Sequence, residues 1–286
     1  MDEMKRGEHV AHSHAASSRA TSGTHRKKKK KNNKLIYYVI LIVLLLVLAF
    51  SSVKIISYLN QQRLSEKQQN AITDEFITPI YNGSEQTGGE DNTNEPTNSS
   101  EPQPEQINVD FTKLCAKYPD TVGYIYGANT GISYPIVKGT NNDFYLNHDY
   151  DGKSNNNGSI FMEYLCNGDF SSGNSIIYGH HMKSGLMFAH LANYKSQSYY
   201  DAHPYFYIYT PSQNYRLDLF AGCVVAGDAD IYSLDPSSDT ISALVSKSTF
   251  KSKIGTPTGK IVTLSTCDYT YDDARYVVLG QLVKID

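Results

Sequence analysis

Cys267 is the residue of this chain best suited to nucleophilic chemistry. It closes a strongly β segment at 261–267, and a seven-residue polar and aromatic turn separates it from Arg275. A cysteine thiolate attacks an amide carbonyl after modest activation, and a guanidinium offers two directed donors to the oxyanion that develops. The spacing predicts a hairpin with Cys267 and Arg275 on adjacent strands at one end of a sheet. Ser265 lies two residues before Cys267, on the same face, where its hydroxyl could contribute.

A general base is the missing partner, and two neighbouring histidines are the candidates. The segment Tyr178-Gly179-His180-His181-Met182 ends a second β segment at 174–179. Histidine is the commonest general base, and Gly179 permits a sharp turn after the strand. Loop histidines without a role and a buried, inert Cys267 would give the same pattern. The residues alone therefore leave the acid/base assignment open.

The elements that must position these side chains are mostly strands. Segments rich in β-branched and aromatic residues alternate with clusters of Gly, Asn, Asp and Pro. The predicted strands are 121–127, 132–137, 158–163, 174–179, 205–210, 214–225, 260–266 and 275–284. Eight strands on one continuous segment predict a closed barrel or a sandwich, because closure removes the sheet edges.

A few helices are expected around these strands. The apolar spacing predicts helices at 108–118, 184–194 and about 236–250. The last of these begins with Asp235 as a cap and Pro236 at the first helical position.

The N-terminal part predicts a membrane anchor. Residues 1–34 form a basic tail with a charge of +7, whereas the rest of the chain carries −10. Residues 35–53 are apolar and uncharged, and at 1.5 Å per residue they span roughly 28 Å, close to the thickness of the hydrocarbon layer. The basic flank predicts a cytoplasmic N-terminus and an extracellular remainder. Because the lysine run lies beside this span, a topology signal and a contact with anionic lipid explain it better than nucleic-acid binding does. We therefore expect no nucleic-acid partner.

The next segment predicts a connection to a folded domain. Residues 54–106 begin with a stretch suited to a short helix, 54–78, which ends before Pro79. Residues 82–106 carry six acids, no bases and no large apolar side chain, which is typical of a disordered spacer. The folded domain is therefore expected at 107–286.

The four cysteines do not predict a disulfide framework. A domain of about 180 residues buries a sufficient core without such bridges. The cysteines also lack the spacing of zinc ligands.

Taken together, these motifs resemble those of the sortase family. TLSTCDYTYDDAR is similar to the sortase signature, in which T-L-x-T-C precedes an arginine. YGHHM, followed by KSGLMFAHL, resembles the class B histidine motif, and the segment from VGYIYG to GSIFME resembles the class B region before it. The resemblance covers 107–286 in the family order of histidine, cysteine and arginine. It implies a mainly β fold: an eight-stranded sortase-type barrel with a few peripheral helices, preceded here by a transmembrane helix.

The resemblance also implies residue roles. Cys267 would be the nucleophile, Arg275 the oxyanion partner and His180 the acid/base, with His181 as the alternative at that site. Three further positions could line the class B substrate groove: Ser265, Tyr178 and Asp268. The resemblance implies no cofactor, and because the calcium-binding acidic set of some class A members is not evident, we expect no metal.

The function implied is that of a membrane-anchored cysteine transpeptidase. Such an enzyme cleaves a C-terminal sorting signal of a secreted protein and passes the acyl group, through a thioester, to an amine of a peptidoglycan precursor or of a pilin. Two alternatives stay open from the sequence. One is a different cysteine peptidase or hydrolase, and the other is a non-catalytic surface module in which Cys267 is inert.

Overall fold

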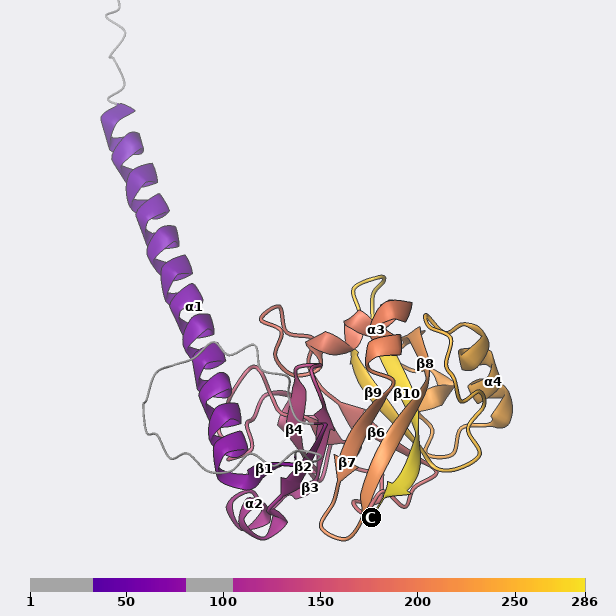
Figure 1. Cartoon of the computed structure of the whole chain (residues 1–286). Coiled ribbons are helices and arrows are strands. Elements are labelled where there is room, and N and C mark those ends of the chain that lie inside the picture. Colours follow the sequence, from indigo (N-terminus) through magenta and orange to yellow (C-terminus); the bar gives the residue numbers. More distant parts are fainter. Residues whose placement is uncertain (1–32, 81–104, 286) are drawn as a thin grey trace, which may run out of the picture. The chain divides into compact units, whose positions relative to one another are not determined.

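The computed structural model describes residues 33–80 and 105–285 of the chain (Figure 1). The chain divides into two compact units, 1–52 and 53–286, and the second contains the whole barrel. The predicted basic tail and acidic spacer lie almost entirely outside the described residues.

Eight strands close into a barrel in the order β10-β8-β7-β3-β4-β5-β6-β9. These strands are β3 (Thr121–Gly127), β4 (Ile132–Val137), β5 (Phe161–Met162), β6 (Asn174–Tyr178), β7 (Tyr205–Tyr209), β8 (Asn214–Ala226), β9 (Ile261–Cys267) and β10 (Ala274–Ile285). Pairing is antiparallel except between β4 and β5 and between β6 and β9. The closed, eight-stranded barrel expected from the sequence is confirmed, although the segment predicted as a strand at 158–163 contributes only the two residues of β5.

Alternation along the strands builds an inner core and an outer one. In β3, Ile125 belongs to the cluster that fills the barrel, whereas Tyr124 and Tyr126 belong to a second cluster outside it. In β7, Ile208 and Tyr207 divide in the same way. Successive strand residues point to opposite faces of a sheet, so a strand that is apolar at every position has both faces covered.

The outer cover comes from the region before residue 107. Helix α1 (Asn33–Phe76) ends with Ile72 and Phe76, which are fully buried against the outer tyrosines. Strand β1 (Ile77–Ile80) then pairs with β2 (Gln106–Val109), and α2 (Phe111–Lys117) follows, capped by Asp110. The sequence prediction placed the start of the folded domain at residue 107. The structure instead includes the end of α1 and β1 in the folded unit, because their apolar side chains cover this face of the barrel.

Polar contacts also hold α1 to the barrel. The Ser65 hydroxyl is buried and accepts hydrogen bonds from Asn155 Nδ2 at 2.9 Å and from Asn157 Nδ2 at 2.8 Å. The three side chains come from segments some 90 residues apart in the chain. Their pairing inside the fold fixes this stretch of α1 relative to the β4–β5 connection.

Two of the predicted helices differ from those observed. The segment 184–194 forms turns and then a 3-10 helix, η2 (Ala189–Lys195), because Gly185 and Met187 adopt positive φ angles that an α-helix excludes. Helix α4 (Ser238–Ser246) begins at the cap Ser237, whose hydroxyl accepts from Thr240 N at 3.1 Å, rather than at Asp235. The remaining short elements are α3 (Gln197–Ala202), η1 (Phe144–Leu146) and η3 (Asp230–Tyr232).

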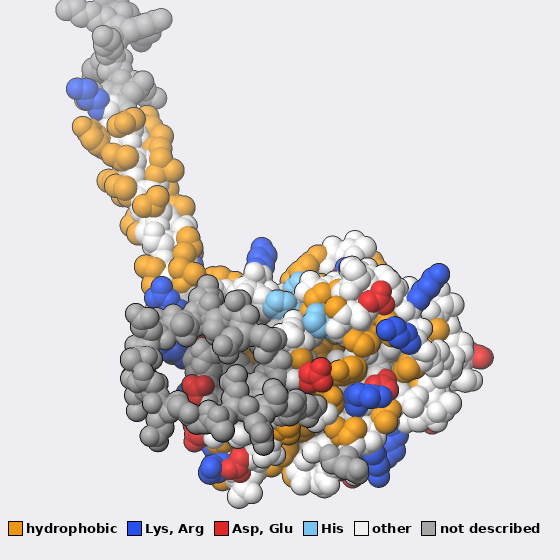
Figure 2. Space-filling view, viewed as in Figure 1, with side chains coloured by type: hydrophobic (Ala, Val, Ile, Leu, Met, Phe, Trp, Pro, Cys, Tyr) orange, Lys and Arg blue, Asp and Glu red, His pale blue; other side chains and the backbone are white. Residues whose placement is uncertain are grey.

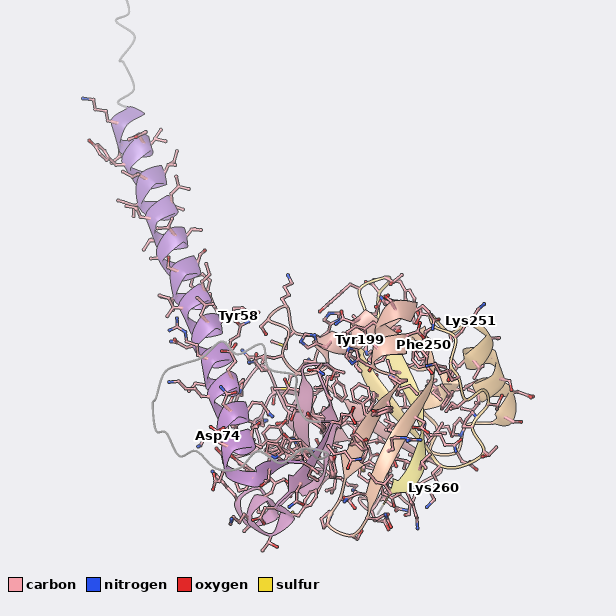
Figure 3. The ribbon with its side chains drawn as sticks, viewed as in Figure 1. Tyr58, Asp74, Tyr199, Phe250, Lys251 and Lys260 are labelled. Carbon is pink, nitrogen blue, oxygen red and sulfur yellow. The ribbon has the colours of Figure 1, made fainter. Side chains whose placement is uncertain are left out.

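These short helices cover particular parts of the barrel. Figure 3 shows Tyr199, on α3, and Phe250 at the same end of the barrel, where both pack against its interior cluster. Helix α4 instead lies over the outer face of β8 and β10, where Ile241 joins a third apolar cluster.

The first part of α1 has the composition of a membrane span. Its large apolar side chains are exposed, and Figure 2 shows them as orange atoms along the face of the helix in view. Among the described residues, α1 is the one helix that is long and apolar enough to cross a membrane, and an 18-residue window of it has a mean hydropathy of 2.9.

Candidate active site

Strand register places the predicted nucleophile beside the predicted oxyanion partner. Arg275 pairs directly with Cys267 across β9 and β10, so both lie at the same end of this antiparallel pair. The hairpin predicted from the sequence is confirmed. Directly opposed residues of an antiparallel pair have Cβ atoms about 4.5–5.5 Å apart, so the register brings these side chains to one spot.

A pocket of about 240 Å³ opens at this end of the barrel. Cys267, Arg275 and His180 all contribute to its wall, and Cys267 is half-buried there. The other residues that line it are Asn142, Asp143, Leu146, Phe161, Tyr178, Gly179, Gly227, Tyr232, Ser265 and Thr266. The fold thus brings five of the six predicted site residues to one cavity from the ends of β6, β9 and β10.

The two histidines of the YGHHM motif point to different surroundings. His180 lines the pocket, and its Nε2 lies 2.7 Å from the carbonyl oxygen of Leu146. His181 is not part of the pocket wall; its Nδ1 lies 2.9 Å from the carbonyl oxygen of Cys267, and its ring lies 5.4 Å from that of Tyr269. His180 is therefore the histidine that shares a cavity with the thiol.

The Leu146 carbonyl also fixes the tautomer of His180. A carbonyl oxygen only accepts, so Nε2 carries the hydrogen and donates it. In the neutral ring, Nδ1 is then the nitrogen free to take a proton. An orienting acceptor behind a catalytic imidazole is the general arrangement of nucleophile–base pairs.

Gly179 turns the chain from β6 toward His180. A Cβ at this position would lie 2.4 Å from Ile160 Cδ1 and 2.8 Å from the ring of Phe188, so no side chain fits. The Gly179 carbonyl accepts from Thr266 Oγ1 at 2.8 Å, and its N–H donates to the carbonyl of Ser265 at 3.1 Å. These bonds join the histidine turn to the strand that carries Cys267.

Tyr178 and Ser265 both line the pocket. They are directly paired across β6 and β9. Tyr178 stacks on Tyr232 with ring centroids 6.2 Å apart, and the Tyr232 and Ser265 hydroxyls lie 2.8 Å from each other. Burial raises the pKa of Tyr178 and raises that of Tyr232 to about 12. Both phenols are therefore neutral hydrogen-bonding groups at physiological pH.

Asp268 lies beside the pocket but does not line it. Its carboxylate is buried and accepts from Thr270 N at 3.0 Å, from the Thr270 hydroxyl and from the Lys195 ammonium. Burial opposes ionisation of this carboxyl, but the bonds from Lys195 and Thr270 outweigh it and hold its pKa below the ordinary value. These contacts indicate that Asp268 anchors the β9–β10 turn to η2.

The guanidinium of Arg275 is oriented by neighbours on its own turn. Its NH2 group lies 2.7 Å from Asp273 Oδ1, and its NH1 group donates to the carbonyl of Ala274 at 3.1 Å. Each group uses one hydrogen in these contacts, which leaves the other for an oxyanion.

Eight of the residues that line the pocket were not among the predicted site residues, and they include Asn142, Leu146 and Tyr232. Asn142 and Leu146 come from the connection between β4 and β5, inside the segment that resembles the class B region, and Tyr232 comes from η3. Nothing in their local sequence marks them as pocket residues. Leu146 in particular acts through its backbone. Within the described residues, no three His, Cys, Asp or Glu side chains gather closely enough to hold a metal ion.

A closed β-barrel that presents a thiol, an imidazole and a guanidinium in one pocket defines a candidate cysteine-dependent acyltransferase. The sequence comparison names the class more closely, because the sortase domain model matches residues 128–283. The chain belongs to the sortase family, whose members are cysteine transpeptidases.

Its relatives are class B sortases. The chain is 36% identical over 175 residues to sortase B of Listeria monocytogenes, an alignment that covers 57% of this chain and 70% of that protein. Among solved structures, sortase B of Bacillus anthracis in complex with AAEK1 matches with a TM-score of 0.60 and 27% identity, over 80% of this chain and 99% of that one. A Staphylococcus aureus sortase B–substrate complex matches with a TM-score of 0.57 and 28% identity, over 62% of this chain and 85% of that one. The class B resemblance of the motifs is thereby confirmed.

Proposed function

We propose that this sortase cleaves a C-terminal sorting signal of secreted proteins and transfers the new carboxyl end to an amine of a peptidoglycan precursor or of a pilin. The observation that carries the proposal is the shared pocket of Cys267, His180 and Arg275, with Cys267 and Arg275 in direct register. Family membership supports the reaction class, and the existence of a substrate complex of the S. aureus relative supports substrate binding by a barrel of this kind.

In the first half of the reaction, the Cys267 thiol gives its proton to His180 and its sulfur attacks the scissile carbonyl carbon. A C–S bond forms, and the second hydrogens of the NH1 and NH2 groups of Arg275 support the negative oxygen. The C–N bond then breaks as His180 returns the proton to the departing amine. A thioester on Cys267 and a free C-terminal fragment result.

In the second half, the acceptor amine attacks the thioester carbonyl. His180 takes the proton that the amine loses as the new C–N bond forms, and the C–S bond breaks to release Cys267. Two acyl transfers through one covalent intermediate predict ping-pong kinetics. No cofactor enters either half.

The N-terminal region supports a surface location for this reaction. A single-pass anchor at residues 35–53 with a cytoplasmic basic tail would leave the barrel outside the cell, where secreted substrates are still held at the membrane. Topology is tested by cysteine-free variants with a single new cysteine before or after the span, probed with a membrane-impermeant thiol reagent on intact cells.

The activity is tested with the full-length chain in detergent micelles, incubated with a pool of sorting-signal peptides and followed by intact-protein mass. We expect a mass increase equal to an N-terminal peptide fragment, absent in Cys267→Ala and cleared by added hydroxylamine. Replacing hydroxylamine by a peptide amine should give a ligated product. An adduct that forms equally well on Cys267→Ala would contradict the mechanism, and a product that is always the free acid would indicate a hydrolase.

A further inference from the structure

A buried carboxylate lies directly behind the pocket wall. Glu163 follows β5, is only 8% exposed and does not itself line the cavity. Its Oε2 accepts from the Tyr178 hydroxyl at 2.9 Å and from Asn142 Nδ2 at 2.6 Å, and both of these residues do line it. Its other oxygen accepts from the N–H of Leu165 at 3.3 Å. Glu163 therefore joins two pocket residues that lie 36 positions apart in the chain.

This carboxylate has no cationic partner among the residues that the structure describes. The ion pairs found there involve other acids. Burial of a carboxylate is costly unless hydrogen bonds compensate for its lost hydration. Here the compensation comes mainly from two side chains of the pocket, so the cost of burying Glu163 is tied to their orientation.

The acceptor-only character of a carboxylate determines what each partner shows to the pocket. Tyr178 has one hydroxyl hydrogen and donates it to Glu163, so the lone pairs of its oxygen are left to accept. Asn142 Oδ1 accepts from Tyr164 N at 3.0 Å, which fixes its carboxamide and leaves one Nδ2 hydrogen to donate. Glu163 thereby makes Tyr178 an acceptor and Asn142 a donor.

The ring of Tyr178 is already fixed by packing. It lies 5.3 Å from the Phe161 ring and stacks on Tyr232 at an interplanar angle of 19°. Packing fixes the ring but still allows the hydroxyl hydrogen to rotate. The hydrogen bond to Glu163 removes this remaining rotation.

We propose that Glu163 is a positioning residue for peptide binding in this pocket. It acts through Tyr178 and Asn142, and it sets an acceptor beside a donor that together match the N–H and C=O of an amide group. The inference rests on the proposed function, since it takes the ligand to be a peptide.

The test measures binding without chemistry. In full-length Cys267→Ala in detergent micelles, fluorescence anisotropy would follow labelled peptides of the sorting-signal pool. Glu163→Gln keeps the shape of the side chain but can donate as well as accept, so it releases the polarity of both partners. We expect Kd for the peptide that binds to rise roughly tenfold, the loss typical of a disrupted hydrogen bond to a charged group. Glu75→Gln, an exposed control on α1 that pairs with Lys117, should leave Kd unchanged.

A double-mutant cycle separates positioning from general stability. If Glu163 acts through Tyr178, Glu163→Gln should raise Kd by less than about threefold in a chain that already carries Tyr178→Phe. In the chain that retains Cys267, its alkylation rate by iodoacetamide should change less than about twofold, since that small reagent needs no amide recognition.

Three results would overturn the inference. In the first, no peptide of the pool binds. In the second, Glu163→Gln leaves Kd within twofold of its value in Cys267→Ala alone, and in the third, alkylation of Cys267 slows as much as peptide binding weakens. Peptide binding without any adduct on Cys267 would instead refute the proposed acyl transfer and leave the inference intact.

Discussion

Backbone carbonyls orient both histidines of the 180–181 pair, but they hold the two rings in different surroundings. The carbonyl of Leu146 holds His180 within the pocket, whereas the carbonyl of Cys267 holds His181 outside it. A sequence motif with two adjacent histidines leaves the acid/base undecided, and the separate hydrogen bonds favour His180. At the residue scale, the role depends on which cavity a ring faces.

His180→Ala should therefore lower acyl transfer by roughly 100-fold or more, the usual contribution of a positioned acid/base. His181→Ala is the matched control and should keep activity within about tenfold, because the His181 ring contacts the backbone of Cys267 and the ring of Tyr269 and does not line the pocket. Rates of peptide adduct formation measured on both variants check this. The reverse ranking would assign the role to His181.

Arg275→Lys should lose about 100-fold in turnover while the chain folds normally. A point charge cannot replace two directed donors, and the contacts to Asp273 and the Ala274 carbonyl already occupy part of the guanidinium. The matched control is Arg216→Lys, which breaks a two-bond contact with Asp218 on β8. Turnover near the unsubstituted rate in Arg275→Lys would remove Arg275 from the mechanism.

At the scale of elements, the turn between β9 and β10 is anchored by one buried carboxylate. Asp268 accepts from the Thr270 N–H at its own turn and from Lys195 on η2. The turn connects the nucleophile to the oxyanion partner, so the stability of this anchor determines how firmly both are held. The sequence resemblance suggested a groove position for Asp268, whereas its contacts in the structure are those of a tether.

Asp268→Asn should lower the melting temperature by a few degrees at neutral pH through loss of the charge pair with Lys195. Because folding lowers the pKa of Asp268, its stabilisation is present above the ordinary value of 3.8 and is lost as the pH falls through the folded value. The difference between variant and unsubstituted chain should therefore vanish by roughly pH 2. Thermal unfolding across pH checks this, with the exposed Asp272→Asn as control; a difference that persists at acid pH would contradict it.

At the scale of the whole molecule, the barrel needs a cover on the outer face of β3 and β7. The tyrosines of that face pack against Ile72 and Phe76 at the end of α1 and against the β1–β2 ribbon. The helix that carries the apolar span therefore also contributes to the core of the folded unit.

Removal of this cover should destabilise the barrel. A chain of residues 107–286 should melt well below one of residues 54–286, since it exposes the outer tyrosines. In the full-length chain, Phe76→Ala should cost about 3–5 kcal/mol in the free energy of unfolding, whereas Leu64→Ala, at an exposed position of α1, should cost little. Equal stability of the two lengths would show that the cover contributes nothing.

The sequence by itself determined the parts of this protein that follow from local pattern. Alternating β segments and turn residues predicted eight strands, and the spacing of Cys267 and Arg275 predicted their hairpin, because strand pairing across a short turn is a local property. The apolar run at 35–53 was evident for the same reason.

Tertiary structure decided what depends on contacts between distant segments. The placement of His180 rather than His181 in the pocket, the contacts of Asp268, and the contributions of Asn142 and Leu146 all depend on contacts between side chains or carbonyls far apart in the chain. The inclusion of Ile72 and Phe76 in the folded unit depends on their burial against β3 and β7. Local propensity carries no information on such pairings, because their free energy arises only when the barrel closes.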